Sequence, residues 1–240
     1  MNKLSLLGLS VATAAVFTGC GGAAGPFGAE MGKSDYPVIG EMRVPYTDVN
    51  SYYGYAKPGT KPDAVVDGKK FSYIYVWVPA VAPEIGVKML SPVPEGMAPE
   101  KDEAGKYLDF ISSTWEANKD EKTKFFDTYI TFERSAIINP ADIAGKYKST
   151  KWFKLASNDD DSSLPANPSG SNYNSLLRHV SEASDPLKAI TRGLYRVGFT
   201  TYKRGEVQGS FLAQVGSPVA IPGVVIDSDI KALVAKVNAK

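Results

Sequence analysis

The sequence predicts a mainly β protein, with an antiparallel sandwich or barrel as its single domain. Of the 240 residues, 43% are apolar and 22% are charged, which is enough to bury the core of one large all-β domain. Between residues 36 and 226, short aromatic and β-branched runs alternate with Gly and Pro, a pattern typical of sandwiches and barrels. Helical periodicity is confined to short stretches, so we expect strands to dominate.

The first 20 residues have the features of a secretory leader. A positive segment with Lys3 precedes an apolar stretch over residues 4–16, which is too short to cross a bilayer as a helix. Residues 17–20 end in Cys20, the one cysteine of the chain, and resemble the cleavage site of bacterial lipoprotein signals, although Phe17 stands where such sites usually have Leu. The resemblance implies cleavage before Cys20 and acylation of its thiol. Ordinary secretion with a free Cys20 is the alternative.

These features divide the chain into a signal peptide (1–19), a lipidated flexible tether (20–35) and one domain (36–240). The tether is rich in small residues that cannot pack a core. Without the leader the chain carries 26 basic and 26 acidic residues, and this balance argues against a nucleic-acid partner. Acyl chains on Cys20 would hold the domain on a membrane surface.

Several runs of aromatic and β-branched residues predict the strands. The clearest run, over residues 71–78, is apolar on both faces and predicts a central strand. In residues 194–200 the odd positions are large and apolar, so one face of that strand should point inward. Further strands are expected at 50–56, 125–134, 194–202 and 207–215. Residues 203–206 predict a hairpin between the last two.

Helix signals are few and mostly short. A turn or two of helix is expected within 103–118 and 140–147, and a capped short helix over 185–190. The C-terminal segment is stronger, because apolar residues recur at helical spacing after a cap at Asp227 or Ser228. The apolar positions of this amphipathic helix are Ile230, Leu233, Val234 and Val237.

The residue inventory argues against the common catalytic sites. The chain has one histidine, His179, and one cysteine, so zinc sites built from several His or Cys ligands are excluded. A Ser-His-Asp or Cys-His triad would need His179, and the sequence has no nucleophile elbow, P-loop or dinucleotide fingerprint. We therefore expect a protein that is not an enzyme.

Hard oxygen ligands could converge in two places, the loop 158–161 and the dipeptide formed by Asp127 and Thr128. Ca²⁺ takes 6–8 oxygen ligands and tolerates irregular geometry. The loop lacks the spacing of an EF-hand, so on composition alone a solvated acidic loop is the better interpretation. A carbohydrate-binding or carbohydrate-active sandwich is the alternative from another class, with the aromatic cluster 52–55 as a stacking platform and a pair of carboxylates beside it.

Three longer segments resemble the leptospiral major outer-membrane lipoprotein family, also called the haemolysis-associated protein. They are SYYGYAKPG at 51–59, SYIYVWVPAVAPEIGVKMLSP at 72–92 and RGLYRVGFTTYKRGEVQGSFLAQVG at 192–216. The resemblance extends from about residue 49 to 225. It implies a jelly-roll-like β-sandwich, lipid-anchored in the bacterial outer membrane, that binds calcium, forms homodimers and binds extracellular-matrix proteins. Such a protein acts either as an adhesin-like surface binding protein or as a structural protein of the envelope without a specific ligand. Whether it faces the cell surface or the periplasm stays open.

The resemblance also implies a set of metal ligands. The family's F-D-T motif matches Asp127 and Thr128, its aspartate run matches Asp159 and Asp160, and its tyrosine before N-S-L matches Tyr173. Because the phenol of Tyr173 is neutral at physiological pH, its main-chain oxygen is the better ligand. This sequence differs from the family's aspartate run at residues 156–158, where the family has more aspartate. The negative field around the predicted ligands is therefore weaker here. Asp161 and Asn158 are then supporting residues and not ligands.

Overall fold

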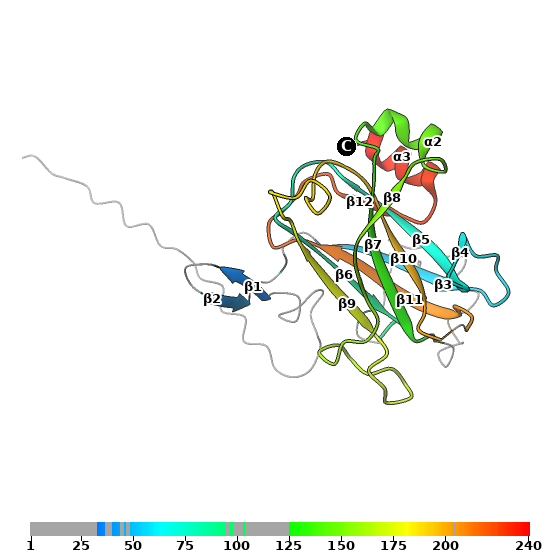
Figure 1. The fold of residues 1–240 in the computed structure, drawn as a ribbon. Helices are drawn as coiled ribbons and strands as arrows, with labels where there is room; N and C mark the ends of the chain where they lie inside the picture. The colour runs from blue at the N-terminus through cyan, green and yellow to red at the C-terminus, as the bar shows by residue number, and fades with distance from the viewer. Residues whose placement is uncertain are drawn as a thin grey trace, which may run out of the picture.

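The protein forms an antiparallel β-sandwich in the computed structural model (Figure 1). The structure describes residues 33–36, 40–43, 46, 49–94, 97, 103, 125–203 and 205–240. The predicted signal peptide, Cys20, most of the tether and nearly all of the helix expected at 103–118 lie outside these residues. No helix in the described part of the chain is both long and apolar enough to span a bilayer.

Two sheets make up the sandwich. The larger has the order β12-β5-β10-β7-β8, with β4 pairing the start of β5, and the smaller has the order β3-β11-β6-β9. The members of the larger sheet are β4 (Ala64–Val66), β5 (Lys69–Val78), β7 (Thr128–Ser135), β8 (Trp152–Asn158), β10 (Gly193–Thr201) and β12 (Val225–Asp227). Those of the smaller sheet are β3 (Asn50–Ala56), β6 (Glu84–Leu90), β9 (Ser175–Val180) and β11 (Gly209–Gly216).

A separate two-stranded ribbon precedes the sandwich. It pairs β1 (Lys33–Tyr36) with β2 (Gly40–Arg43) in antiparallel register. The first of these strands begins within the residues that the sequence assigns to the tether.

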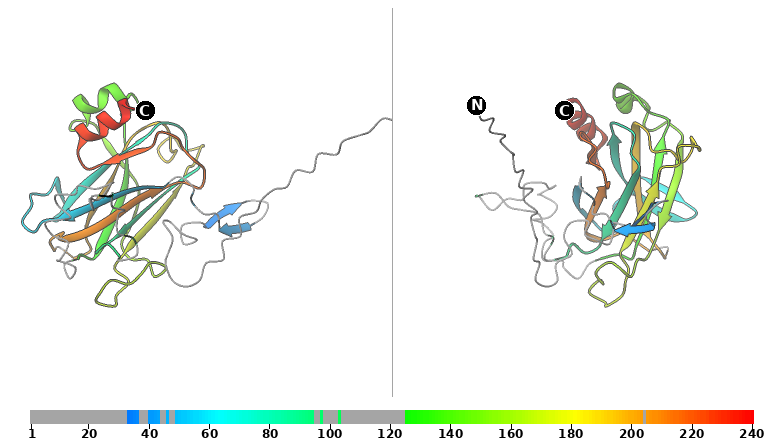
Figure 2. Two further views of the ribbon diagram at one scale, coloured as in Figure 1. Left: turned by 180° about the vertical axis from the view of Figure 1, so that it is seen from behind. Right: turned by 90° about the vertical axis from the view of Figure 1, so that its left-hand side faces the viewer.

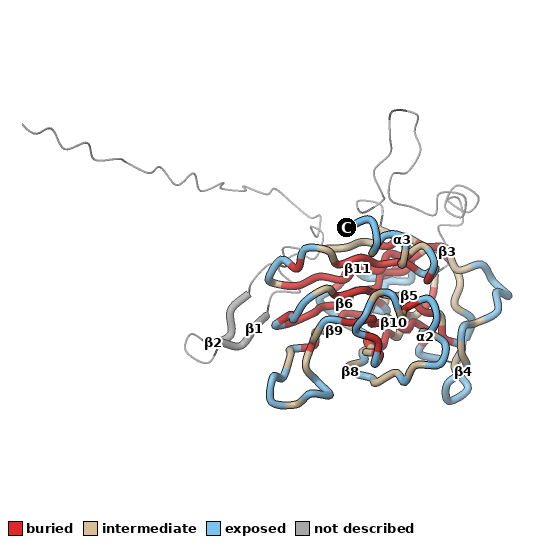
Figure 3. The backbone as a smooth tube through the Cα atoms, turned by 90° about the horizontal axis from the view of Figure 1, so that it is seen from above, coloured by how far each residue is buried: buried red, intermediate tan, exposed pale blue. Residues whose placement is uncertain are grey.

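The main core lies between the sheets, where alternate residues of each strand point inward. In β10 these are Tyr195, Val197 and Phe199, all buried, as the odd-position pattern predicts. They face apolar residues of the smaller sheet such as Phe211 and Val87. Figure 3 shows the buried positions concentrated along the strands, with exposed positions in the connecting loops.

Helices cover one end of the larger sheet on its outer face. A 3₁₀ turn (η3, Pro140–Asp142) leads into α2 (Ile143–Lys146), and α3 (Ile230–Asn238) packs beside it (Figures 1 and 2). Ile143, Ile230 and Leu233 form a second apolar cluster with Trp77. The expected helices at 140–147 and at the C-terminus are therefore present.

Three local predictions differ from the structure. The hairpin expected at 203–206 is wrong, because β10 pairs with β5 and β7 while β11 belongs to the other sheet. Residues 185–190 form hydrogen-bonded turns instead of a helix, with the Asp185 carboxylate accepting from the Leu187 amide over 2.9 Å. The cap of α3 is Asp229, whose Oδ1 accepts from two backbone amides, and not Asp227 or Ser228.

The connection between β3 and β5 also contains a strand that the sequence pattern did not reveal. Strand β4 forms a tight hairpin with β5 through Asp67 and Gly68, which have φ angles of 51° and 76°. Two consecutive residues with positive φ suit the twist of a two-residue hairpin, and Asp followed by Gly adopts that conformation readily.

Candidate metal site

The acidic residues lie at the end of the sandwich opposite to helices α2 and α3 (Figure 1). Strands β7 and β8 pair, with Ile130 opposite Asn158, and this places the start of β7 beside the end of β8. The start of β9 lies against both strands across the gap between the sheets. The fold therefore brings together Asp127, Thr128, Asp159, Asp160 and Tyr173, which are the five positions that the sequence predicts as ligands.

Thr128 and Tyr173 form the direct link between β7 and β9. The Thr128 amide donates to the Tyr173 carbonyl oxygen over 2.9 Å, and the Thr128 hydroxyl lies 3.1 Å from the same oxygen. Tyr173 itself is 37% exposed, so its ring is not enclosed by the site. The main-chain oxygen of Tyr173 thus contacts Thr128, while its role as a metal ligand stays a prediction.

Ser175 is a buried residue of the candidate site that the sequence-based prediction does not include. Its buried hydroxyl accepts from the Thr128 hydroxyl over 2.7 Å and lies in short contact with the carbonyl oxygens of Thr128 and Asp159. One side chain thereby joins β7, the end of β8 and β9. The only signal in the sequence is its place two residues after Tyr173, inside the quoted motif.

Backbone and amide hydrogen bonds fix the loop between β8 and β9. The Asn158 side-chain amide donates to the Leu176 carbonyl over 2.6 Å, and the Asp161 amide donates to the Asn174 carbonyl over 2.9 Å. Asn174 is buried and donates to the Pro165 carbonyl over 2.6 Å. Asn158 and Asp161 therefore hold the loop in place, which suits supporting roles.

The carboxylate of Asp127 is the least satisfied group of the site. Its Oδ1 atom is buried without a hydrogen-bond partner among the described residues. Burial, together with the nearby Asp160 and Asp159 carboxylates, raises the pKa of Asp127 to about 6, while Lys203 and Lys69 oppose the change. The pKa of Asp160 is also raised, by burial and by Asp159. A cation at this place would relieve both the desolvation and the repulsion.

The donor set fits a hard cation in chemical type. Carboxylate, hydroxyl and carbonyl oxygens are the ligands that Ca²⁺ prefers. In the part of the chain that the structure describes, no group of three or more His, Cys, Asp or Glu side chains is gathered at metal-binding geometry. One reason is that the Asp159 carboxylate accepts from the Asp160 amide over 2.8 Å. Ion binding at these residues therefore needs the Asp159 and Asp160 side chains to turn toward Asp127.

His179 occupies a structural position. It is buried on β9, and its Nε2 atom lies 2.7 Å from the Lys188 carbonyl oxygen. This contact holds the 185–190 turns against the sheet. The histidine thus has the role expected of a core residue.

The aromatic cluster 52–55 does not form an open stacking platform. Tyr52 is buried between the sheets, and its hydroxyl lies 2.6 Å from the Ser228 hydroxyl. Tyr55 and Tyr75 are half-buried. The rings of Tyr75 and Tyr147 pack edge to face, with centres 5.8 Å apart, under α2. These positions favour structural roles for the tyrosines over sugar stacking.

Comparison with known proteins identifies the family of the chain. A family of surface lipoproteins from the order Spirochaetales, named Lipl32, matches residues 40–226, which include both sheets and every predicted metal ligand. Among curated protein sequences, none matches significantly. Because the family match covers most of the 240 residues, the chain belongs to this family of spirochaete surface lipoproteins.

Proposed function

We propose that this surface lipoprotein binds one Ca²⁺ ion at the β7–β8–β9 end of the sandwich. The observation that supports the proposal most is the buried, unpartnered Oδ1 atom of Asp127, whose pKa is raised by burial and by the negative charges of Asp160 and Asp159. An unpaired buried carboxylate oxygen destabilises a fold, whereas coordination to a cation satisfies it.

Five residues supply the oxygen ligands in this proposal. Asp127, Asp159 and Asp160 contribute carboxylates, Tyr173 its carbonyl and Thr128 its hydroxyl. In the structure the Thr128 hydroxyl and the Tyr173 carbonyl face each other at 3.1 Å. The Thr128 amide also donates to the Tyr173 carbonyl oxygen over 2.9 Å, so these two residues would hold the ion from adjacent positions.

The ion acts as a structural clamp and not as a catalyst. It ties the loop between β8 and β9 to the start of β7, where Ser175 already joins the same three segments. The clamp holds one loop-rich end of the domain in a fixed shape. We propose that this end, or the adjoining sheet surface, binds an external protein such as an extracellular-matrix component, and that the domain associates as a homodimer.

The position of the protein in the cell follows from acylation of Cys20, which is also a proposal. Acyl chains on this thiol anchor the domain in the outer membrane without a spanning helix. Labelling cells with an alkyne-tagged fatty acid tests it. The wild-type chain should incorporate the label, and a Cys20→Ser chain that is still labelled would contradict the anchor.

A calcium titration of thermal stability tests the metal site. At a free Ca²⁺ concentration about a hundredfold above Kd, binding adds about 2.7 kcal/mol, which corresponds to a Tm increase of roughly 5–10 °C for a domain of this size. The same titration of an Asp127→Ala chain should show no increase. An Asp185→Ala chain is the control, because this carboxylate lies in the 185–190 turns near His179 and should leave the calcium response intact. A wild-type Tm that is equal in calcium and in EGTA would refute the proposal.

A further inference from the structure

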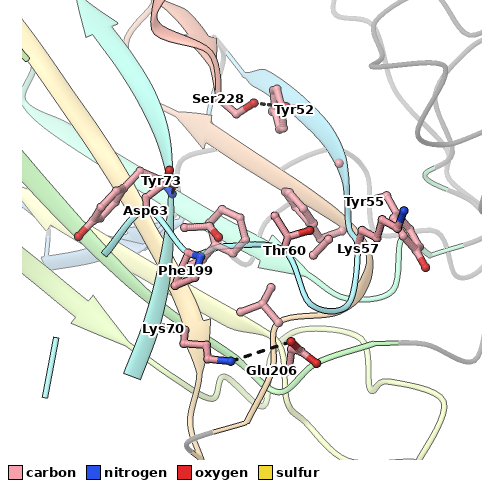
Figure 4. Close-up of a pocket in the computed structure, with 16 residues that line it drawn as sticks. Tyr52, Tyr55, Lys57, Thr60, Asp63, Lys70, Tyr73, Phe199, Glu206 and Ser228 are labelled. Atoms are coloured by element: carbon pink, nitrogen blue, oxygen red, sulfur yellow. Dashed lines mark hydrogen bonds and ion pairs between the residues drawn. The ribbon is translucent and has the colours of Figure 1, made fainter. Parts of the chain in front are cut away.

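A cavity of about 520 Å³ opens at the edge of the sandwich, between β3 of the smaller sheet and β5 of the larger one (Figure 4). Its walls also include the ends of β10 and β11 and the loop that follows β3. The volume is in the range of pockets that hold small ligands. The cavity shares no residue with the proposed calcium ligands.

The inner wall of the cavity is aromatic and apolar. The rings of Phe199 and Phe211 lie 4.9 Å apart, and Tyr52 stacks on Phe211 with ring centres at 6.3 Å. The outer edge of the Phe211 ring packs against Gly54, where a Cβ atom would approach the ring Cζ atom to 2.2 Å. The absence of a side chain at Gly54 therefore keeps this ring in place. Ala56 and Val207 extend the apolar lining toward the opening.

The mouth of the cavity carries polar groups, most of which are already engaged. Glu206 accepts from the Gly59 amide over 2.8 Å, and Asp63 accepts from the Tyr73 amide over 2.8 Å. Both carboxylates thus hold the loop between β3 and β5. The hydroxyl of Ser228 is bonded to that of Tyr52.

The two lysines at the mouth differ from these groups. Lys70 and Glu206 are 4.0 Å apart with both side chains about half exposed, so their attraction is weak. For Lys57, the described residues include no ion-pair partner, and its side chain is exposed at the rim. Figure 4 shows Lys57 and Lys70 on opposite sides of the opening. The lining therefore offers a ligand a partly apolar interior and two ammonium groups, with Thr60 and Ser72 as further polar residues.

We propose that this cavity binds a single-chain anionic amphiphile, with its apolar chain along Ala56 and Val207, over the nearly buried rings of Phe199 and Phe211, and its anionic head beside Lys57 and Lys70. A sugar fits this lining less well, because both mouth carboxylates already accept from backbone amides and are not free to accept from sugar hydroxyls. The inference is independent of the calcium site. The ligand could be a free fatty acid or a single-chain phospholipid, since both present an anionic head on an alkyl chain.

Isothermal titration of the full chain with dodecanoate, below its micellar concentration, tests the proposal. Dodecyltrimethylammonium and dodecyl maltoside have the same chain with a cationic or a neutral head, and both should bind about tenfold more weakly. Lauroyl-lysophosphatidylglycerol distinguishes the two sources, because tighter binding than dodecanoate identifies a phospholipid and weaker binding identifies a fatty acid.

Two variants with matched controls locate the binding. Val207→Trp fills the apolar lining and should weaken dodecanoate binding by about tenfold or more, whereas Val219→Trp, at a distant exposed position, should not. The double change Lys57→Glu and Lys70→Glu should remove the preference for an anionic head, whereas Lys61→Glu in the same loop should retain it. Dodecanoate that binds equally to wild type and Val207→Trp, or a preference that survives the double change, would overturn the proposal.

Discussion

The cavity and the candidate metal site lie near each other in the sandwich, but they are built in different ways. The cavity is formed by strand residues whose aromatic rings pack on one another, and its buried polar groups have partners. The metal site is formed where three segments end, and it contains a buried carboxylate oxygen without a partner among the described residues. Phe126 joins the two regions, because its ring lies 6.1 Å from that of Phe199 while its neighbour in the chain is Asp127.

The cavity and the candidate metal site therefore obtain their stability from different interactions. Apolar packing acts at any calcium concentration, so the cavity side of the domain should be stable by itself. The acidic side combines desolvation with like-charge repulsion, and the cation that we propose offsets both. Mutations on the two sides should therefore differ in whether calcium changes their effect.

The largest expected effect is the loss of the Phe211 ring. Phe211→Ala removes a buried side chain that packs on Tyr52 and Phe199, and it should lower the free energy of unfolding by about 3–5 kcal/mol. Chemical denaturation of wild type and variant, in calcium and in EGTA, measures this loss in the free energy of unfolding. The loss should be the same in both, and a loss that is confined to EGTA would show that the two regions are not independent.

A smaller loss of stability is expected when a methyl group is added beside the Phe211 ring. Gly54→Ala puts a methyl group 2.2 Å from the Phe211 ring, and overpacking of this kind costs about 1–3 kcal/mol. Gly145→Ala is the matched control, because Gly145 lies in α2 with open space around its Cβ position. Thermal melting should show a lower Tm for Gly54→Ala and an equal or higher Tm for the control. An unchanged Tm for Gly54→Ala would mean that the ring moves freely.

Ser175→Ala tests the candidate metal site, and its expected destabilisation is similar to that of Gly54→Ala. The change removes the Ser175 hydroxyl as donor to the Thr128 and Asp159 carbonyl oxygens, and it should cost about 1–3 kcal/mol in EGTA. It should also weaken calcium binding, because the three segments that carry the ligands lose their common link. Ser162→Ala, at an exposed position in the loop between β8 and β9, should stay within about 0.5 kcal/mol of wild type. Equal calcium affinity in the two variants would remove Ser175 from the site.

Some features of this fold can be predicted from the sequence and others cannot. The alternation in β10 and the apolar run in β5 predict which residues face the core, because side-chain direction follows from the local period. The same alternation does not reveal which sheet a strand joins, so the hairpin predicted at 203–206 is wrong although both of its strands exist.

The candidate metal site also has residues that the sequence predicts and contacts that only the structure shows. Asp127 and Asp160 are predicted as ligands from the family resemblance, because each lies in a short motif that the sequence shows directly. Two other features depend on contacts between residues far apart in the chain. They are the hydrogen bonds of Ser175 and the packing of the Phe211 ring on Gly54, and no local sequence pattern predicts either.

The smallest expected effect is the pH dependence that Asp127 contributes without calcium. Its pKa is about 6 in the folded protein against an ordinary value of 3.8, so the folded state binds the proton more tightly than the unfolded state does. Stability from this group is therefore full below about pH 4, falls as the pH rises through 6, and stays low above it. Asp127→Asn removes the charge, and in EGTA at pH 8 it should raise Tm by about 1–3 °C, with the difference from wild type vanishing near pH 4. In calcium the sign should reverse, because wild type gains the ion and the variant does not. An Asp127→Asn chain that melts below wild type in EGTA at pH 8 would show that the carboxylate is satisfied by the protein itself, and the main structural argument for the ion would be lost.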